Sequence, residues 1–299
     1  MRDSEITFVI QGNPYCRNGV NYTKKLVTAL RKYYPGASIV LSVNQENCPD
    51  LGQDCSVTNV DVGAIVVEGL KPLNVNRQIV STLNGFKAAR TPWACKIRSD
   101  LLLTKRIDFQ YYYRNYPERG ANASFRERII VTDITTKNFR VNPAYINHVC
   151  DWFYFGRTSD LLKLFDIELY DIHKIPIRNG SYSMSAETYI WTAYLAKSKP
   201  VSAIEAEKYL IDNAIVISGS EVGLYPTKTG YRLPFGVNGF LQTNVVDWQL
   251  MYNQYLDENY RVKSLDVIKS NFLKAYYKLR WYAFRPAFLA RSILKKYVL

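Results

Sequence analysis

The chain has 299 residues, enough to bury a substantial core, and this length favours one α/β-sized domain with an appendage. Its 39 Lys and Arg residues exceed its 26 Asp and Glu residues, so the formal net charge is +13 at pH 7. Such a charge predicts an anionic partner: a nucleic acid, an anionic lipid or a phosphorylated substrate. No apolar run reaches about eighteen residues, which excludes a membrane-spanning helix.

The cysteines and the first residues indicate a cytosolic protein. The cysteine number is odd and no pair has the CxxC spacing of a zinc or redox site, so we expect reduced thiols at Cys16, Cys48, Cys55, Cys95 and Cys150. The stretch "MRDSEITFVIQGN" lacks the apolar core of a signal peptide. We therefore expect a cytoplasmic chain.

Residues 6–100 alternate between strand-like and helix-like patterns. Apolar, β-branched runs predict strands over 6–12, 37–43, 62–69 and 93–100. Helical spacing predicts one helix over 22–36, which ends at Pro35 and Gly36, and a second from about Asn74. Strands that alternate with helices of this length predict a mostly parallel sheet built from right-handed crossovers.

The second half of the chain has a weaker pattern. Residues 105–145 show no clear period and predict loops with a short helix, whereas 129–134 and 149–156 have the composition of strands. Helices are predicted over 160–165, 183–197 and 247–262, and short strands and turns over 201–250.

Polar residues follow the predicted strands at the points where the strands end. In open α/β sheets, ligands bind outside the carboxyl ends of the strands, so these side chains have a physical reason to gather there. The residues are Gln11, Gly12 and Asn13 after the first strand, Asn44, Gln45 and Glu46 after the second, and Arg98, Ser99 and Asp100 after the fourth.

The segment 74–100 combines a helix start and a strand end at one edge of the sheet. The helix begins near Asn74, Asn76 and Arg77, so its positive end and these polar groups face the edge to which the next strand delivers Asp100. A diphosphate there would meet helix N–H groups, a guanidinium and a carboxylate. Mg²⁺ and Mn²⁺ sites often use one carboxylate plus phosphate oxygens, so a single Asp suffices. The alternative is that Asp100 caps a helix or pairs with Arg98.

This helix-strand unit resembles the one that leads to the DxD metal site of GT-A glycosyltransferases, with Arg98 in place of the first acid. The stretches "IQG", "YPGASIVLS", "NRQIVSTLNGFKAA", "CKIRSD" and "DWFYFGRTSDL" together resemble the WavE-type lipopolysaccharide-synthesis family of bacterial glycosyltransferases. The resemblance implies a GT-A-like single α/β domain with a mostly parallel central sheet flanked by helices. We place it over 1–265, with a nucleotide-sugar half at about 1–104 and an acceptor half at 105–265.

The resemblance also implies roles for the edge residues. Gln11, Gly12 and Asn13 would contact the nucleotide, and Asn44 or Glu46 the base. Arg77 and Arg98, with Asn76 and Ser99 beside them, would face the diphosphate. Asp100 would hold a divalent cation, Mn²⁺ or Mg²⁺, although Arg98 supplies part of the charge that a cation normally provides.

An inverting transferase needs a carboxylate to deprotonate the acceptor hydroxyl, and two positions compete for this role. Glu187 in "SAETYIW" stands in the first turn of a predicted helix, where its alternative role is a favourable interaction with the helix dipole. Asp151 in "CDWFYFG" precedes an aromatic run suited to stacking on sugar rings; its alternative role is a strand-end turn. A retaining enzyme would need neither residue as a base.

The C-terminal stretch 267–299 contains eight Lys or Arg residues and no acid. Phe272, Tyr276, Leu279 and Ala283 form an apolar stripe, and Pro286 divides the stretch in two. This pattern predicts a basic aromatic helical tail over 266–299 that associates with anionic lipid; the alternative is a packed terminal helix with a solvated basic face.

The resulting hypothesis is a glycosyltransferase, peripheral on the cytoplasmic face of the bacterial inner membrane. It would move a sugar from a nucleoside diphosphate-sugar to a lipid-linked glycan of the O-antigen, core or capsule, beside other polysaccharide-assembly enzymes and without nucleic acid. The rival is a non-catalytic nucleic-acid- or lipid-binding protein, favoured by Tyr111, Tyr112, Tyr113 and Arg114. A nucleotidyltransferase is a lesser alternative, since the expected Gly-rich first loop is missing.

Overall fold

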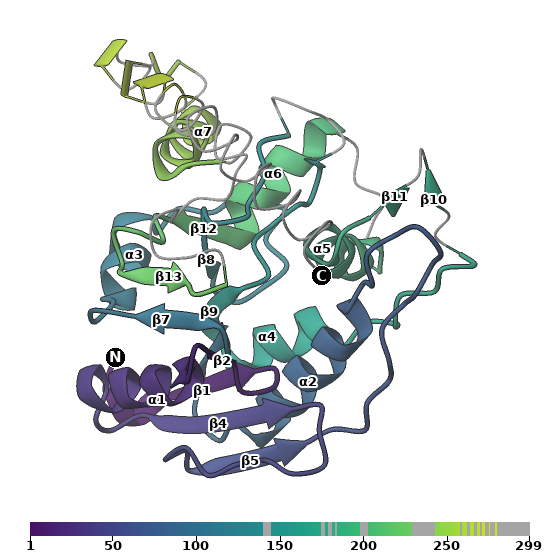
Figure 1. Ribbon diagram of the computed structural model, residues 1–299. Coiled ribbons are helices and arrows are strands. Elements are labelled where there is room, and N and C mark those ends of the chain that lie inside the picture. The colour runs from purple at the N-terminus through teal and green to yellow at the C-terminus, as the bar shows by residue number, and fades with distance from the viewer. Residues whose placement is uncertain are drawn as a thin grey trace.

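The computed structural model (Figure 1) describes residues 1–139, 145–174, 177–178, 181–182, 184–197, 203–228 and 243–257, with scattered positions from 259 to 279. Its helices are the 3₁₀ turn η1 (Asp3–Glu5), α1 (Tyr22–Tyr33), α2 (Val75–Ala88), α3 (Phe109–Asn115), α4 (Thr158–Phe165), α5 (Ala186–Ala196), α6 (Ala203–Asn213) and α7 (Val245–Leu256). Its strands are β1 (Ile6–Gln11), β2 (Cys16–Arg17), β3 (Val20–Asn21), β4 (Ser38–Val43), β5 (Cys55–Thr58), β6 (Trp93–Arg98), β7 (Leu101–Leu103), β8 (Ile129–Thr132), β9 (Phe153–Arg157), β10 (Ile177–Arg178), β11 (Ser181–Tyr182), β12 (Ala214–Ile217) and β13 (Leu224–Pro226).

A seven-stranded sheet forms the centre of the molecule, in the order β12-β8-β9-β6-β1-β4-β5. Neighbouring strands run parallel except at β9, which is antiparallel to both β6 and β8. Helices α2 and α4 contact each other and pack on β1, β4, β6 and β9 (Figure 1). The prediction of an α/β fold with a mostly parallel sheet flanked by helices is therefore confirmed.

Local sequence explains the elements at the front of the chain. All six residues of β1 are buried, as expected for a central strand covered on both faces. Helix α1 begins where the Asn21 side chain accepts a hydrogen bond from the Lys24 N–H, and it buries Leu26, Val27 and Leu30 at helical spacing. Helices connect the parallel strands β1, β4 and β6, so these three strands end at the same edge of the sheet.

The antiparallel strand β9 brings a distant segment to this edge. Ile97 pairs with Phe153 in the register of β6 and β9, and the Arg98 N–H donates to the Trp152 carbonyl at 3.1 Å. Asp151, which precedes β9, therefore lies beside the end of β6.

The prediction of a third strand over 62–69 is wrong. The strand that pairs with β4 is β5, and 62–69 forms only an isolated bridge from Ile65 to Leu73. Asp54 holds the chain against β4, because its carboxylate accepts from the Ile39 N–H at 2.7 Å and pairs with Arg31 at 2.6 Å. The edge of β4 is thus occupied by β5, which precedes the apolar run over 62–69 in the chain. Val66 in this run is exposed.

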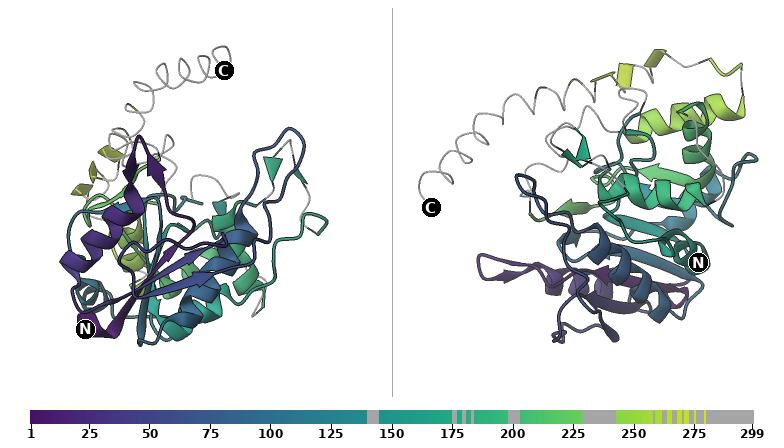
Figure 2. Two further views of the ribbon diagram at one scale, coloured as in Figure 1. Left: turned by 60° about the horizontal axis from the view of Figure 1, so that its bottom comes forward. Right: turned by 90° about the vertical axis from the view of Figure 1, so that its right-hand side faces the viewer.

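Within the described residues, three small two-stranded sheets lie outside the central sheet. They pair β2 with β3, β7 with β13, and β10 with β11. Figure 2 shows the β2–β3 hairpin projecting from the body of the fold. The pairing of β13 with β7 matters for the site, because it returns a late segment of the chain to the end of β6.

No helix within the described part of the chain is long and apolar enough to cross a membrane. The predicted basic tail over 266–299 falls almost entirely outside the described residues. Phe272 and Leu279, two described members of its apolar stripe, are exposed. All five cysteines are free.

Candidate active site

Two cationic side chains converge on the carboxylate of Asp100, just beyond the end of β6. The Arg98 guanidinium donates from Nε to Oδ1 at 3.0 Å and from Nη2 to Oδ2 at 2.7 Å. Lys228 Nζ lies 3.0 Å from the same Oδ2. The alternative that Asp100 pairs locally with Arg98 is therefore observed, with a second cation added from the segment after β13.

Charge and burial stabilise this arrangement. Burial opposes ionisation of Asp100, but Arg98 and Lys228 hold the pKa of its carboxyl below the ordinary value. Burial likewise opposes the charge of Arg98, and the carboxylates of Asp100 and Asp151 raise the pKa of its guanidinium above the ordinary value. The carboxyl of Asp100 and the guanidinium of Arg98 are therefore both ionised at neutral pH.

The backbone after β1 lies against the backbone after β6. The Ser99 N–H donates to the Gln11 carbonyl at 2.9 Å, and Ser99 Oγ donates to the Asn13 carbonyl at 2.7 Å. Gly12 has φ +102°, and a Cβ at this position would approach Ser99 Oγ to 3.3 Å. Glycine is thus needed where the chain leaves β1. The Gln11 side chain turns inward and donates to Ser81 on α2 at 2.9 Å.

The residues predicted after β4 reach the same edge. The Asn44 N–H donates to Asn13 Oδ1 at 2.8 Å, which joins the ends of β4 and β1. Asn44 Oδ1 is buried and has no hydrogen-bond partner among the described residues. An unpaired buried acceptor of this kind is unusual, and contact of Asn44 with the nucleobase stays a prediction. Glu46 is exposed on the segment that follows.

Two predicted residues of α2 are held by protein contacts. The Arg77 guanidinium forms a bidentate ion pair with Asp61, with both N–O distances 2.6 Å. The Asn76 side chain accepts from the Tyr170 N–H at 2.7 Å and donates to the Tyr170 carbonyl at 3.1 Å. Their roles in nucleotide binding stay predictions, and both side chains would have to exchange these partners to contact a ligand.

Asp151 is 3 % exposed and lies next to the buried Lys96. Its Oδ2 accepts from Gln78 Nε2 at 2.6 Å, and its backbone carbonyl accepts from Lys96 Nζ. Its Oδ1 is buried with no hydrogen-bond partner among the described residues. Burial lowers the pKa of Lys96 to about 8, and the charge of Asp151 partly offsets this effect. The carboxylate thus has one oxygen held by Gln78 and one buried oxygen without a hydrogen-bond partner among the described residues.

Glu187 stands in the first turn of α5, after Ser185, whose side chain accepts from the Thr188 N–H and caps the helix. Burial and the nearby charge of Asp151 raise the pKa of Glu187 to about 7. The two carboxylates predicted as base and acceptor contact are therefore neighbours. A pKa near neutrality is the value that suits a general base.

Asp100 was predicted to hold a divalent cation. In the structure, the two oxygens of its carboxylate already contact Arg98 and Lys228. A metal ion there would have to displace both cations, so the carboxylate as it stands does not fit one. Within the described ranges, no three His, Cys, Asp or Glu side chains are grouped as a metal site. The use of Mn²⁺ or Mg²⁺ stays a prediction.

The family assignment follows from a match to known sequences over most of the chain. The WavE lipopolysaccharide synthesis family matches residues 6–281, which include every predicted site residue. The chain belongs to this family. No curated protein matches it.

Two solved structures resemble this WavE-family chain at low sequence identity. One is 4-diphosphocytidyl-2C-methyl-D-erythritol synthase from Anaerococcus prevotii DSM 20548, with 10 % identity over 74 % of this chain and 91 % of that one, at a TM-score of 0.36. Another is S. aureus TarS, with 11 % identity over 86 % of this chain and a TM-score of 0.41. The match covers 40 % of TarS. Identities at this level carry no information about activity.

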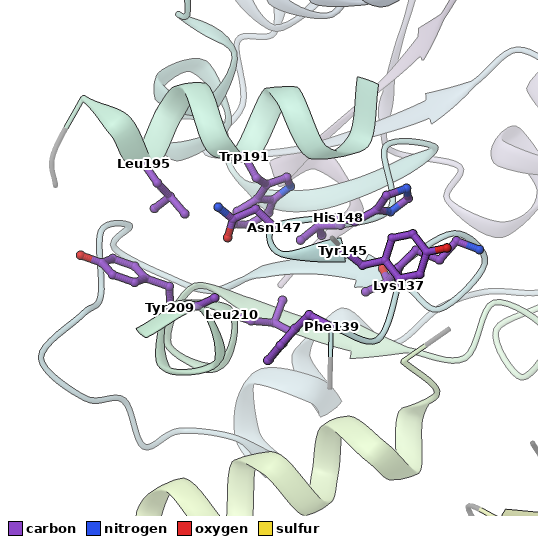
Figure 3. A pocket seen from close by; sticks show the side chains of 12 residues that line it. Lys137, Phe139, Tyr145, Asn147, His148, Trp191, Leu195, Tyr209 and Leu210 are labelled. Atoms are coloured by element: carbon purple, nitrogen blue, oxygen red, sulfur yellow. The ribbon is translucent and has the colours of Figure 1, made fainter. Parts of the chain in front are cut away.

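A small pocket opens on the second half of the WavE-family chain (Figure 3). Trp191, one turn after Glu187 on α5, forms part of its wall together with Leu195 and Leu210. Lys137 and His148 also line it, and His148 Nδ1 is buried without a hydrogen-bond partner in the described chain. Burial lowers the pKa of His148 to about 4, so this imidazole is neutral at pH 7. The pocket therefore offers aromatic and polar surface near the carboxylates.

Three residues of the site were not predicted from the sequence. Lys96 carries a visible signal, because a lysine inside the apolar run of "WACKIR" has to be buried with a partner. Gln78 and Lys228 carry none, since an exposed glutamine or lysine would have the same local pattern. Their roles follow only from contacts with Asp151 and Asp100.

Proposed function

We propose that this chain is a glycosyltransferase that moves a sugar from a nucleoside diphosphate-sugar to a lipid-linked bacterial surface glycan. The observation that supports this most directly is the position of Arg98. Its guanidinium forms two hydrogen bonds with Asp100, and the charges of Asp100, Asp151 and Glu187 all raise its pKa. An anion-binding edge and a carboxylate pair are what the donor diphosphate and the acceptor hydroxyl respectively require.

Glu187 is the proposed general base. With a pKa near 7, a large fraction of its carboxyl is ionised at neutral pH, and the ionised form can accept the proton of an acceptor hydroxyl. Asp151 contributes through its negative charge, which raises the proton affinity of Glu187, and through the free Oδ1, which can accept a hydrogen bond from the acceptor sugar. Gln78 and Lys96 position Asp151 for this contact.

The pocket beside α5 is the proposed acceptor side. Trp191 and Tyr145 provide ring surface, and Asn147 and Lys137 provide polar groups around it. Sugar rings are bound by this combination of apolar faces and hydrogen-bonding groups.

The proposal is tested by product analysis. The purified chain would be incubated with a panel of nucleoside diphosphate-sugars and a lipid-linked acceptor, with Mn²⁺, with Mg²⁺ and with excess EDTA. We expect transfer from one donor, together with thermal stabilisation by the matching nucleoside diphosphate and not by an oligonucleotide. Stabilisation by an oligonucleotide alone would favour the nucleic-acid-binding rival, and turnover of a nucleoside triphosphate would favour a nucleotidyltransferase.

We also propose that the tail over 266–299 binds the anionic membrane surface that carries the acceptor. Its eight cationic residues would attract the anionic surface, with about 1 kcal/mol for each Lys or Arg near it. Its apolar stripe would add burial in the lipid. The full chain is expected to float with anionic vesicles, and a chain ending at residue 265 is expected to lose this flotation. Zwitterionic vesicles serve as the control. Equal flotation of both chains would contradict membrane binding by the tail.

A further inference from the structure

The Arg98–Asp100–Lys228 cluster joins two segments that are far apart in the chain, and backbone contacts hold these segments together. Thr227 donates to the Asp100 carbonyl through its N–H at 2.9 Å and its Oγ1 at 2.7 Å. The β13–β7 pairing continues this contact with Pro226 opposite Leu101. The backbone next to Lys228 is therefore held against Asp100 by contacts other than the ion pair between their side chains.

Both cations are also oriented by aromatic rings. The Arg98 guanidinium lies 4.5 Å over the Trp152 ring, and Lys228 Nζ lies 5.1 Å over the Tyr15 ring. The Asp100 side chain is only 6 % exposed, whereas those of Arg98 and Lys228 are 24 % and 56 % exposed. The acid is enclosed and the two cations remain accessible from solvent.

The charges of the cluster leave a net positive site. Two cations and one carboxylate give 2 − 1 = +1, and both cations keep N–H donors that Asp100 does not use. Arg17, in the projecting β2–β3 hairpin, donates to the carbonyls of Thr227 and Lys228 at 3.3 Å and adds a further positive charge. Guanidinium and ammonium groups with free donors are the groups that proteins use to bind phosphate oxygens.

We propose that Arg98 and Lys228 bind the donor diphosphate directly, with Asp100 as the positioning residue that holds the two cations and not as a metal ligand. This inference rests on the proposed donor class and specifies how that donor is held. The cluster lies at the carboxyl end of β6, next to the Gly12 turn, where ligands of parallel sheets bind. Its two cations supply the charge that a divalent cation supplies when bound to a pair of acids.

The test measures binding of inorganic pyrophosphate and of uridine and guanosine diphosphates by calorimetry, in excess EDTA and in Mn²⁺. We expect the wild-type chain to bind in EDTA, with little change on adding Mn²⁺. Lys228→Ala is expected to weaken binding by about tenfold to a hundredfold, because a charged hydrogen bond to phosphate is lost. Lys228→Arg, which keeps the charge, is expected to restore most of the affinity.

Lys87→Ala is the matched control. Lys87 is exposed in the last turn of α2, which leads into the start of β6 at the opposite edge of the sheet. Its removal changes the net charge by the same amount as Lys228→Ala. Equal weakening by both variants would overturn the proposal, since it would reduce the effect to overall charge.

The remaining outcomes separate this inference from the proposed function. Pyrophosphate binding in EDTA without sugar transfer from any donor would support the cation pair and contradict the transferase. Sugar transfer with pyrophosphate binding only in Mn²⁺, abolished by Asp100→Asn, would support the transferase and overturn the cation pair in favour of a metal at Asp100. Failure of the wild-type chain to bind any of the three probes would overturn both.

Discussion

Replacing Glu187 by glutamine is expected to lower the rate of sugar transfer by about 10²- to 10⁴-fold, the usual contribution of a general base. Glutamine has nearly the same shape but cannot accept the proton of the acceptor hydroxyl. Nucleotide affinity should stay unchanged, because the diphosphate is proposed to bind to Arg98 and Lys228 and not to Glu187. The measurement is kcat together with nucleotide binding by calorimetry.

Glu168→Gln is the control for this substitution, since Glu168 is a surface residue whose side chain is 83 % exposed. It should retain the wild-type rate. In the wild-type chain, transfer should increase as the pH rises through about 7, where Glu187 loses its proton. A Glu187→Gln variant with an unchanged rate, together with an inactive Asp151→Asn variant, would assign the base to Asp151.

The same substitution should also change the pH dependence of stability. The pKa of Glu187 is raised from 4.5 to about 7, so the folded chain holds this proton more tightly than the unfolded chain. The stability associated with the proton is complete below pH 4.5 and is lost as the pH rises through about 7. Glutamine does not ionise, so the Glu187→Gln variant does not lose this stability as the pH rises. With allowance for partial solvent screening, the variant should be more stable than the wild type by about 1–3 kcal/mol above pH 8.

Replacing Arg128 by methionine is expected to lower the free energy of unfolding by about 3–5 kcal/mol. Arg128 is 1 % exposed and directly precedes β8. Its guanidinium donates to the backbone carbonyls of Tyr116, Glu118 and Ile211, and it lies 5.2 Å over the Tyr252 ring. Methionine fills part of the volume but leaves all three carbonyls without this donor.

Arg126→Met provides a closely matched control for Arg128→Met. Arg126 is exposed, and only its backbone forms described hydrogen bonds, so its side chain can be removed at a cost within about 0.5 kcal/mol. The two variants would be compared by urea denaturation at the same pH. Burial lowers the pKa of Arg128 to about 10, so its charge persists at pH 7. Equal stabilities of the two variants would show that the buried contacts of Arg128 are not needed.

The order of the elements in the first half of the chain is predictable from the sequence alone. The apolar run of β1, the capped amphipathic helix α1 and the helix-strand unit from α2 to β6 all have patterns that depend on neighbouring residues. The run over 62–69 shows the limit of such patterns. Its composition is that of a strand, but the position beside β4 is occupied by β5, and the contacts between Asp54 and Ile39 hold the chain there.

For the residues around the site, too, the sequence determines one part of the arrangement and the tertiary structure the other. The sequence by itself determines that a ligand-binding edge of the sheet carries Arg98, Ser99 and Asp100. This follows from their position directly after an apolar strand. The partners of these residues are not local. Lys228 reaches Asp100 because β13 pairs with β7, and Asp151 reaches Arg98 because β9 runs antiparallel to β6. Only the tertiary structure decides that Asp100 faces two cations, because charges that are far apart in the chain interact only once the sheet brings them within a few ångströms.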